Sequence, residues 1–431
     1  MKIRSVDCHV LNPGRPVSWG TGWSKNTVII QVQTDEGIDG IGEAFHSLDE
    51  PIVGAVEKFA RSLVGRDPTE VQRNWQRVYR GLRYQLGTAE LAALSAIEQA
   101  MWDIAGKAAG LPVYKLLGGP TRDRIRVYAS GYLCQPQHFE IEGGDLIDAC
   151  TACAAAGFTA VKFTPQPDDY ADLTPAEVHA AAVERVRAVR EAVGDGVDIC
   201  LDYHGRSFSP SDAVLLAHDI EQYRPMFLEE PSRTENADGL AESKAKTSIP
   251  IAAGERTSTT AQLLELLDRR AIHIFQPEPT ANGGILQTIK WAAMCEARQV
   301  SIAPHQACGP VSLLVCAHID ASIENFLIQE CNVDLDDQFY RDLFTPLPTV
   351  RDGYLELPEA PGLGIELNQE ALDKYPAKPY DRPIITNAEC ARIKALGSTA
   401  VAEHAGLVAR TLSLLFPAGS GTAGMRQRLD E

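Results

Sequence analysis

The sequence predicts an α/β protein in which a small α+β domain precedes a barrel of parallel strands covered by helices. Three observations support this prediction. The first 50 residues alternate as strands do, and the next stretch, to about residue 118, has the periodicity of amphipathic helices. Short apolar strands then alternate with helices as far as about residue 331, and the chain becomes Pro-rich and strand-like again from about residue 351.

The first domain is predicted to be a small antiparallel sheet with helices. Its strands are IRSVDCHVL, NTVIIQVQTDEG and IDGIGEAF, and the Asp-Glu-Gly sequence is a tight-turn signal. Two helical segments follow, PIVGAVEKFARSLVG and TAELAALSAIEQAMWDIAGKAAG. Each of them ends in a glycine, which is the residue that most often closes a helix.

Eight apolar strands are predicted in the barrel. They are IRVYAS, FTAVKFT, VDICLDY, PMFLEEP, IPIAAGE, IHIFQPE, QVSIAPH and NFLIQEC. The helices between them include PAEVHAAAVERVRAVREAVG, TTAQLLELLDRR and GGILQTIKWAAMCEARQ. Near-continuous apolar strands are typical of a parallel sheet covered by helices, and eight such units favour a closed barrel. Catalytic residues are then expected at the C-terminal ends of the strands.

The domain boundaries follow from these changes of pattern. We expect a capping domain over residues 1–125 and a catalytic barrel over residues 126–350. A return segment over residues 351–388 is expected to pack on the capping domain. Residues 389–431 form a C-terminal extension to which we assign no role.

The composition narrows the class of protein. A hydrophobic content of 45% with 23% charged residues is typical of a soluble globular chain. The net charge of -18 argues against a nucleic-acid partner, because phosphate binding needs a basic surface. No apolar run reaches bilayer length and no signal-peptide core is present, so we expect a cytoplasmic protein without membrane contact. The ten cysteines, including Cys150 and Cys153, are predicted to be reduced packing residues.

Three acidic residues stand at the ends of three consecutive predicted strands. They are Asp202, Glu229 and Glu255, separated by 27 and 26 residues, which is about one strand-loop-helix unit each. In a closed parallel barrel their carboxylates converge at one face. Carboxylate oxygens are the ligands that Mg²⁺ prefers, so the spacing predicts a magnesium site.

Further polar residues are predicted to share that face. Side chains two apart on a strand point the same way, so His204 accompanies Asp202 and Thr164 accompanies Lys162. The other strand-end residues are Glu278, His305 and Glu330. A metal beside basic side chains is what abstraction of a proton alpha to a carboxylate requires, because the metal holds the carboxylate and stabilises the enediolate.

These motifs resemble the enolase superfamily, in its mandelate racemase subgroup, across roughly residues 1–385, and most closely its acid sugar dehydratases of the galactonate dehydratase type. The matching segments are DYHGR, FLEEP, IPIAAGER, QPEPTANGGI, APHQACGP and NFLIQE. Asp202, Glu229 and Glu255 match the three metal ligands. The resemblance implies a modified TIM-type (β/α)7β barrel, an N-terminal α+β capping domain completed by a C-terminal segment, and a homo-oligomer between dimer and octamer.

The resemblance also implies roles for individual residues. His305 would be the base that takes the proton, and His204 the general acid that protonates the departing hydroxide. Glu278 would orient His305, because a carboxylate on the second ring nitrogen raises the basicity of a histidine. Glu330 and Lys162 would act beside the substrate carboxylate.

Two positions depart from the family pattern. Thr164 stands where the subgroup's K-x-K motif has a second lysine, so racemisation between a lysine and a histidine is disfavoured and loss of water is favoured. Glu278 stands where the family usually has an aspartate, and its extra methylene changes the geometry of the pair with His305.

Substrate recognition is expected from loops of the first domain that close over the barrel, as the resemblance implies. The candidates there are Trp23, Lys25 and His46. In the barrel, Arg256 and Thr164 are the corresponding candidates.

The sequence therefore predicts a Mg²⁺-dependent dehydratase that converts an acid sugar to a 2-keto-3-deoxy acid. Two alternatives stay open. One is an epimerase, racemase or lactone cycloisomerase that uses the same first step, and the other is a sugar-acid binding protein that has lost turnover.

Overall fold

The protein is described from a computed structural model. One compact unit comprises residues 1–166 and 179–380 and holds both the first domain and the barrel. The predicted extension 389–431, together with Trp23 and His46, lies outside the described residues. The structure describes residues 1–15, 25–45, 49–139, 144–167, 170–207 and 209–378.

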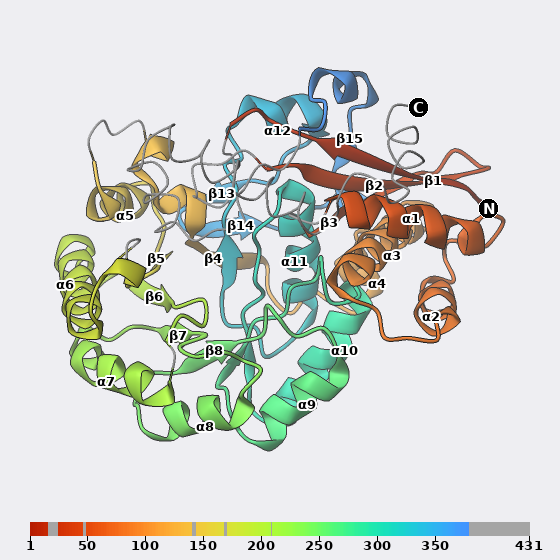
Figure 1. Ribbon diagram of the computed structural model, residues 1–431. Coiled ribbons are helices and arrows are strands. Elements are labelled where there is room, and N and C mark those ends of the chain that lie inside the picture. The colour runs from red at the N-terminus through yellow and green to blue at the C-terminus, as the bar shows by residue number, and fades with distance from the viewer. Residues whose placement is uncertain (16–24, 46–48, 140–143, 168–169, 208, 379–431) are drawn as a thin grey trace, which may run out of the picture. The chain divides into compact units, whose positions relative to one another are not determined.

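The first domain is a three-stranded antiparallel sheet packed on helices (Figure 1). Gly40 and Gly42 let β3 lie directly on α3, because a Cβ at either position would stand about 2 Å from a helix carbonyl oxygen. The sheet and the helical stretch to about residue 118 confirm the prediction for this part of the chain, in which α1 and α3 were specified and α2 and α4 were not. The strands are β1 (Ile3–Leu11), β2 (Thr27–Thr34) and β3 (Gly40–Ala44), and the helices are α1 (Asp49–Leu63), α2 (Val71–Gly81), α3 (Thr88–Ala109) and α4 (Val113–Leu116).

Eight parallel strands form the barrel. Adjacent strands pair in the order β10, β9, β8, β7, β6, β5, β4, and β11 pairs with the other edge of β4. A parallel bridge between Ile302 and Phe326 closes the ring. The strands are β4 (Arg124–Ala129), β5 (Ala160–Phe163), β6 (Asp198–Asp202), β7 (Phe227–Glu229), β8 (Ile251–Ala253), β9 (Ile274–Phe275), β10 (Ser301–Ile302) and β11 (Gln329–Cys331).

Seven described helices connect these strands and lie outside them, and β11 is the last strand of the barrel (Figure 1). This is the (β/α)7β arrangement, as predicted. The helices are α5 (Leu146–Ala155), α6 (Pro175–Val193), α7 (Pro210–Ile220), α8 (Ala237–Ala245), α9 (Thr260–Asp268), α10 (Ile285–Glu296) and α11 (Pro310–Ser322). Short 3₁₀ turns are η1 (Gly131–Cys134), η2 (Pro136–Phe139), η3 (Tyr170–Asp172) and η4 (Glu221–Tyr223).

An apolar layer fills the interior of the barrel. It takes one residue from each strand or from the position next to it, and every one of them is buried. Because barrel interiors are packed cores and not pores, this layer forms the floor below the strand ends. The residues are Tyr128, Ala160, Cys200, Phe227, Ala252, Ile274, Ala303 and Ile328.

The return segment contacts both parts of the unit. Its strand β14 pairs antiparallel with barrel strand β4, whereas beyond it Leu363 N donates to Asp103 of α3 and Asn12 N donates to Tyr375 O. Its elements are β14 (Tyr354–Glu356), β15 (Glu366–Leu367) and η5 (Gln369–Lys374), and α12 (Gln338–Leu343), β12 (Phe344–Thr345) and β13 (Val350–Arg351) lead into it.

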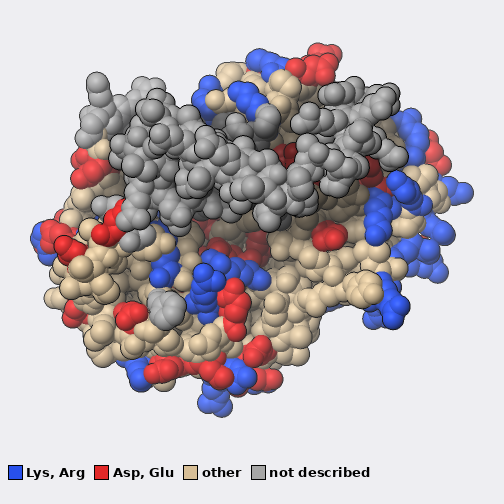
Figure 2. Space-filling view, viewed as in Figure 1, with Lys and Arg blue, Asp and Glu red and all other residues tan. Residues whose placement is uncertain are grey.

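The described surface carries charges of both signs, and the described cysteines are reduced. On the face drawn in Figure 2, described acidic and basic side chains are interspersed, and the basic ones are most numerous over α1 and α2. No described helix is both long and apolar enough to span a bilayer. Cys150 and Cys153 are buried in α5, and no disulfide forms among the described cysteines.

Candidate active site

A layer of polar side chains lies above the apolar floor of the barrel, at the C-terminal ends of the strands. Side chains two residues apart on a strand point to the same face, so the residue two positions after each floor residue also points into the barrel. Strand β8 is the exception, because that position is Gly254, with a φ of +152°, and the acidic residue Glu255 comes one position later. The polar residues are Ser130, Lys162, Asp202, Glu229, Glu255, Gln276, His305 and Glu330.

Lys162 connects three strand ends. Its Nζ lies 2.7 Å from Glu229 Oε2, 3.0 Å from Glu330 Oε1 and 3.3 Å from Asp202 Oδ2. Burial disfavours the ammonium, but Glu229 and Glu330 outweigh it and hold the pKa of Lys162 well above its usual value. One cation is therefore shared by three carboxylates, and the cluster keeps an excess of negative charge.

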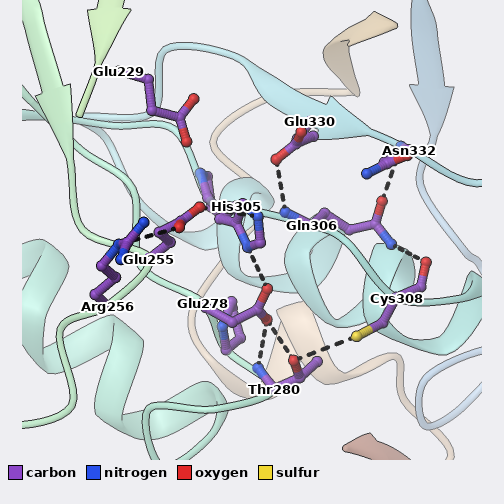
Figure 3. Close-up of polar contacts among 12 residues, drawn as sticks. Glu229, Glu255, Arg256, Glu278, Thr280, His305, Gln306, Cys308, Glu330 and Asn332 are labelled. Carbon is purple, nitrogen blue, oxygen red and sulfur yellow. Dashed lines mark hydrogen bonds and ion pairs between the residues drawn. The ribbon is translucent and has the colours of Figure 1, made fainter. Parts of the chain in front are cut away.

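His305 lies between two carboxylates (Figure 3). Its Nδ1 is 2.7 Å from Glu278 Oε2, and its Nε2 is 3.3 Å from Glu255 Oε2. Burial opposes protonation, yet the charge of Glu255 and the hydrogen bond to Glu278 raise the pKa of His305 to about 10. The longer acid at position 278 thus reaches the imidazole, and its other oxygen accepts hydrogen bonds from Thr280 N at 2.8 Å and Thr280 Oγ1 at 2.6 Å.

His204 follows the end of β6 in a left-handed conformation, with φ of +52°. Its backbone N–H donates to Asp202 Oδ1 at 3.0 Å, and its ring Nδ1 lies 3.4 Å from the same oxygen. Arg256 donates to His204 O at 3.1 Å and to Glu230 Oε2 at 2.6 Å. The predicted substrate ligand Arg256 therefore holds the backbone of His204, and the buried Glu230 is its ion-pair partner.

The donor set fits a divalent cation. Glu229 Oε1 is buried, and no hydrogen-bond donor of the described residues reaches it. Burial and the charge of Asp202 raise the pKa of Glu229 to about 8. A surplus of buried carboxylate oxygens suits Mg²⁺. Within the described ranges, no group of three or more His, Cys, Asp or Glu side chains is arranged so that it could hold a metal ion. In this arrangement Asp202 and Glu229 pair with Lys162, and Glu255 pairs with His305.

The other predicted substrate-binding residues are less well defined. Thr164 is half-buried just after β5, and its carbonyl accepts a hydrogen bond from Arg185 at 3.3 Å. Lys25 is buried in the first domain. Trp23 and His46 fall outside the described residues, so their role stays a prediction.

Three residues of the site were not predicted. Gln306 N donates to Glu330 Oε2 at 3.0 Å, and its side-chain oxygen accepts from Asn332 N at 3.1 Å (Figure 3). Thr280 holds Glu278, and Glu43 of β3 contacts the loop after His305. The signal for Glu43 was a charged residue inside the otherwise apolar strand sequence GIGEAF.

Two family models match the chain. The Mandelate racemase / muconate lactonizing enzyme N-terminal domain covers residues 4–118, and the Enolase C-terminal domain-like model covers residues 145–371. Together they span the described sheet of the first domain and most of the barrel.

Similar proteins include acid sugar dehydratases. The chain is 36% identical to D-galactonate dehydratase of Ralstonia nicotianae, over 79% of this chain and 89% of that protein. It is 35% identical to D-gluconate dehydratase of Thermoproteus tenax, over 84% of this chain and 72% of that protein. Dehydratases of this kind are hydro-lyases.

Solved structures agree with the family models. A mandelate racemase/muconate lactonizing enzyme-like protein from Roseovarius sp. TM1035 matches with a TM-score of 0.78 and 33% identity, over 88% of this chain and 96% of that chain. A mandelate racemase/muconate lactonizing enzyme from Sulfitobacter sp. matches with a TM-score of 0.79 and 30% identity, over 88% and 96%. The resemblance inferred from the motifs is confirmed, and the chain belongs to the mandelate racemase/muconate lactonizing enzyme family of the enolase superfamily.

Proposed function

We propose that the protein is a Mg²⁺-dependent dehydratase of an acid sugar, which removes the proton alpha to the carboxylate and eliminates the 3-hydroxyl to give a 2-keto-3-deoxy acid. The observation that carries the proposal is the His305–Glu278 pair, at 2.7 Å, at the mouth of a barrel that also holds His204. The two dehydratase relatives support the substrate class, with D-galactonate and D-gluconate as the first compounds to test.

Asp202, Glu229 and Glu255 are the residues that would hold Mg²⁺. When bound, the cation would supply positive charge beside the carboxylate of the substrate, which makes the alpha proton more acidic. Lys162 adds a fixed positive charge on the same side and keeps Glu330 ionised, since it lies 3.0 Å from that carboxylate.

His305 takes the alpha proton on Nε2, because its Nδ1 faces Glu278. The negative charge of Glu255 raises the proton affinity of His305 as long as no cation neutralises that charge. Sharing Glu255 with a cation lowers that proton affinity, and Glu278 then keeps the ring oriented as a base.

His204 is assigned to the second half of the reaction. It would donate a proton to the departing hydroxyl, so that water leaves. Its side chain is 25% exposed, which leaves the ring accessible from the barrel mouth. Thr164 stands where a second lysine base would be needed for racemisation, which favours elimination.

One panel of substrates tests the proposal. The purified protein with Mg²⁺ is incubated in deuterated water with aldonic and aldaric acids, and both 2-keto-3-deoxy product and deuterium at the alpha carbon are measured. Product identifies a dehydratase. Deuterium exchange without product identifies an epimerase instead. If neither product nor exchange is detected with any compound of the panel, the proposal that the protein is an enzyme is ruled out.

A matched pair of variants tests the assignment of the base. His305→Asn should abolish alpha exchange, whereas His218→Asn, at an exposed histidine of α7, should keep it. Survival of exchange in His305→Asn would show that another group is the base. The predicted homo-oligomer stays a prediction, which the mass of the particle in solution can check.

A further inference from the structure

The end of strand β3 reaches from the first domain to the loop that carries His305. Glu43 accepts two hydrogen bonds from the barrel, from Gly309 N to Oε1 at 2.7 Å and from Ser312 N to Oε2 at 2.9 Å. The ring of Phe45, two residues on, lies 6.3 Å from the ring of His305. The two hydrogen bonds of Glu43 join residues that are 266 and 269 positions apart in the chain.

Glu43 replaces a cap that helix α11 lacks. The helix begins after Gly309, which has no side chain to accept its first backbone N–H groups. A serine or aspartate at that position would cap the helix from within the same segment. Instead the acceptor comes from another domain, and a carboxylate only 1% exposed is maintained there although burial raises its pKa to about 7.

Hydrogen bonds hold the loop between His305 and Gly309 from both domains. On the barrel side, His305 N donates to Pro277 O at 3.1 Å and Gln306 N donates to Glu330 Oε2 at 3.0 Å. On the side of the first domain, Glu43 accepts from Gly309 N at the far end of the loop, and Cys308 Sγ lies 3.9 Å from Ala44 O.

We propose that Glu43 is a positioning residue for the reaction, which fixes the loop of His305 from the capping domain and so places the imidazole against the substrate. The inference rests on the proposed function, in which His305 moves the alpha proton. The capping domain then takes part in holding the base, because the far end of the loop of His305 is bonded to β3.

Glu98 of α3 provides a matched control. Its carboxylate is 1% exposed and accepts from Ile285 N at 2.8 Å and Leu286 N at 2.9 Å, at the start of α10. Its pKa is likewise raised to about 7 by burial. It therefore performs the same capping for α10, which follows the loop of Glu278 and not the loop of His305. Glu278 itself is bonded to Thr280 and not to Glu98.

The test compares Glu43→Gln with Glu98→Gln in the full-length protein. Glutamine keeps one acceptor oxygen but cannot accept both N–H groups, so the two variants should shift the melting temperature by similar amounts. For alpha exchange we expect Glu43→Gln to lower kcat about tenfold or more with KM unchanged, since small displacements of a reacting group are costly. Glu98→Gln should keep kcat within about twofold.

A second variant approaches the same contact from the other side. A Cβ at Gly309 would lie 2.7 Å from Glu43 Oε1, and Gly309 has a φ of -89°, which suits any residue. Gly309→Ala should therefore displace the carboxylate and lower kcat as Glu43→Gln does. Equal losses of kcat in Glu43→Gln and Glu98→Gln, or none in Glu43→Gln, would overturn the inference.

A chemical readout separates this inference from the proposed function. Modification of His305 by diethyl pyrocarbonate is followed by peptide mass spectrometry in the three proteins, without substrate. Faster modification in Glu43→Gln than in wild type and Glu98→Gln supports positioning by Glu43, and equal rates contradict it. If the wild type exchanges no proton from any sugar acid, the proposed function fails while this measurement still decides the role of Glu43.

Discussion

The molecule contains two sets of buried carboxylates, and they are satisfied in different ways. In the contact between the first domain and its neighbours, each carboxylate accepts two hydrogen bonds from backbone N–H groups, and Asp103 also pairs with Lys107. At the mouth of the barrel, each carboxylate faces a side-chain cation or an imidazole, and Asp202 and Glu330 accept one backbone N–H group each in addition. The first set is Glu43, Glu98 and Asp103, and the second is Asp202, Glu229 and Glu330, with the half-buried Glu255 beside them.

The difference separates structure from chemistry. A backbone donor cannot leave without unfolding the segment that carries it, so the first set ties elements together permanently. A lysine, arginine or histidine side chain can move away from a carboxylate and be replaced as its partner by a metal ion or a substrate. An excess of negative charge favours that replacement by a cation. Buried charge therefore marks a candidate site only where its partners can be replaced.

Glu229→Gln is expected to have the largest effect. Its Oε1 has no donor among the described residues, and the amide is nearly the same size but carries no charge. We expect the Mg²⁺-dependent activity to fall at least about a thousandfold, which corresponds to roughly 4 kcal/mol. Above pH 8, the melting temperature without divalent cations should stay or rise, because Glu229 then carries a buried negative charge that the amide lacks.

Glu230→Gln is the control, since it changes the next residue, whose carboxylate pairs with Arg256. It should lower the melting temperature and leave the Mg²⁺ concentration needed for activity unchanged. The same dependence on Mg²⁺ in Glu229→Gln and wild type would contradict the assignment of Glu229 as a metal ligand.

Lys162→Met should have the next largest effect. Three carboxylates then lose the cation that they share, and an uncompensated buried charge typically costs about 3 to 4 kcal/mol. Urea unfolding measures this loss. Adding Glu229→Gln to Lys162→Met should recover part of the stability, because the two groups are 2.7 Å apart and their effects are coupled. Strict additivity would show that the pair does not interact.

Glu98 provides a pH test of the first set. Burial raises the pKa of Glu98 in the folded protein to about 7, above the 4.5 of an unburied glutamate. The folded state therefore binds more protons between these values, so stability is full below pH 4.5 and falls as the pH rises to 7. Between pH 5 and pH 8, wild type should lose up to about 3 kcal/mol relative to Glu98→Gln. Parallel stability curves would contradict this pKa.

The sequence was sufficient for the second set and not for the first. Strand ends that recur at the period of a βα unit bring Asp202, Glu229 and Glu255 together in any closed parallel barrel, so local patterns predict the mouth. The contacts of Glu43 and Glu98 join residues 187 or more positions apart, and no periodic pattern in the sequence predicts which residues meet. Their partners are backbone groups, which carry no sequence signal.

Details within the site were beyond prediction for a similar reason. The extra methylene of Glu278 changes the geometry toward His305, but the sequence does not state which way the side chain turns. Thr280 decides it, because its N–H and its hydroxyl both bind Oε1 and leave Oε2 for the imidazole.

Thr280→Val tests how Glu278 is oriented, because this carboxylate has both a backbone donor, Thr280 N, and an imidazole partner, His305. Glu278 accepts from fixed donors on one oxygen and from an exchangeable imidazole on the other. Valine removes the hydroxyl donor and keeps the backbone one, so Glu278 becomes less firmly oriented. Losing one hydrogen bond to a charged group should lower kcat for alpha exchange about tenfold, or roughly 1.4 kcal/mol. Thr280→Ser should restore it, and an equal loss in both variants would mean that the methyl group, and not the hydroxyl, holds the pair.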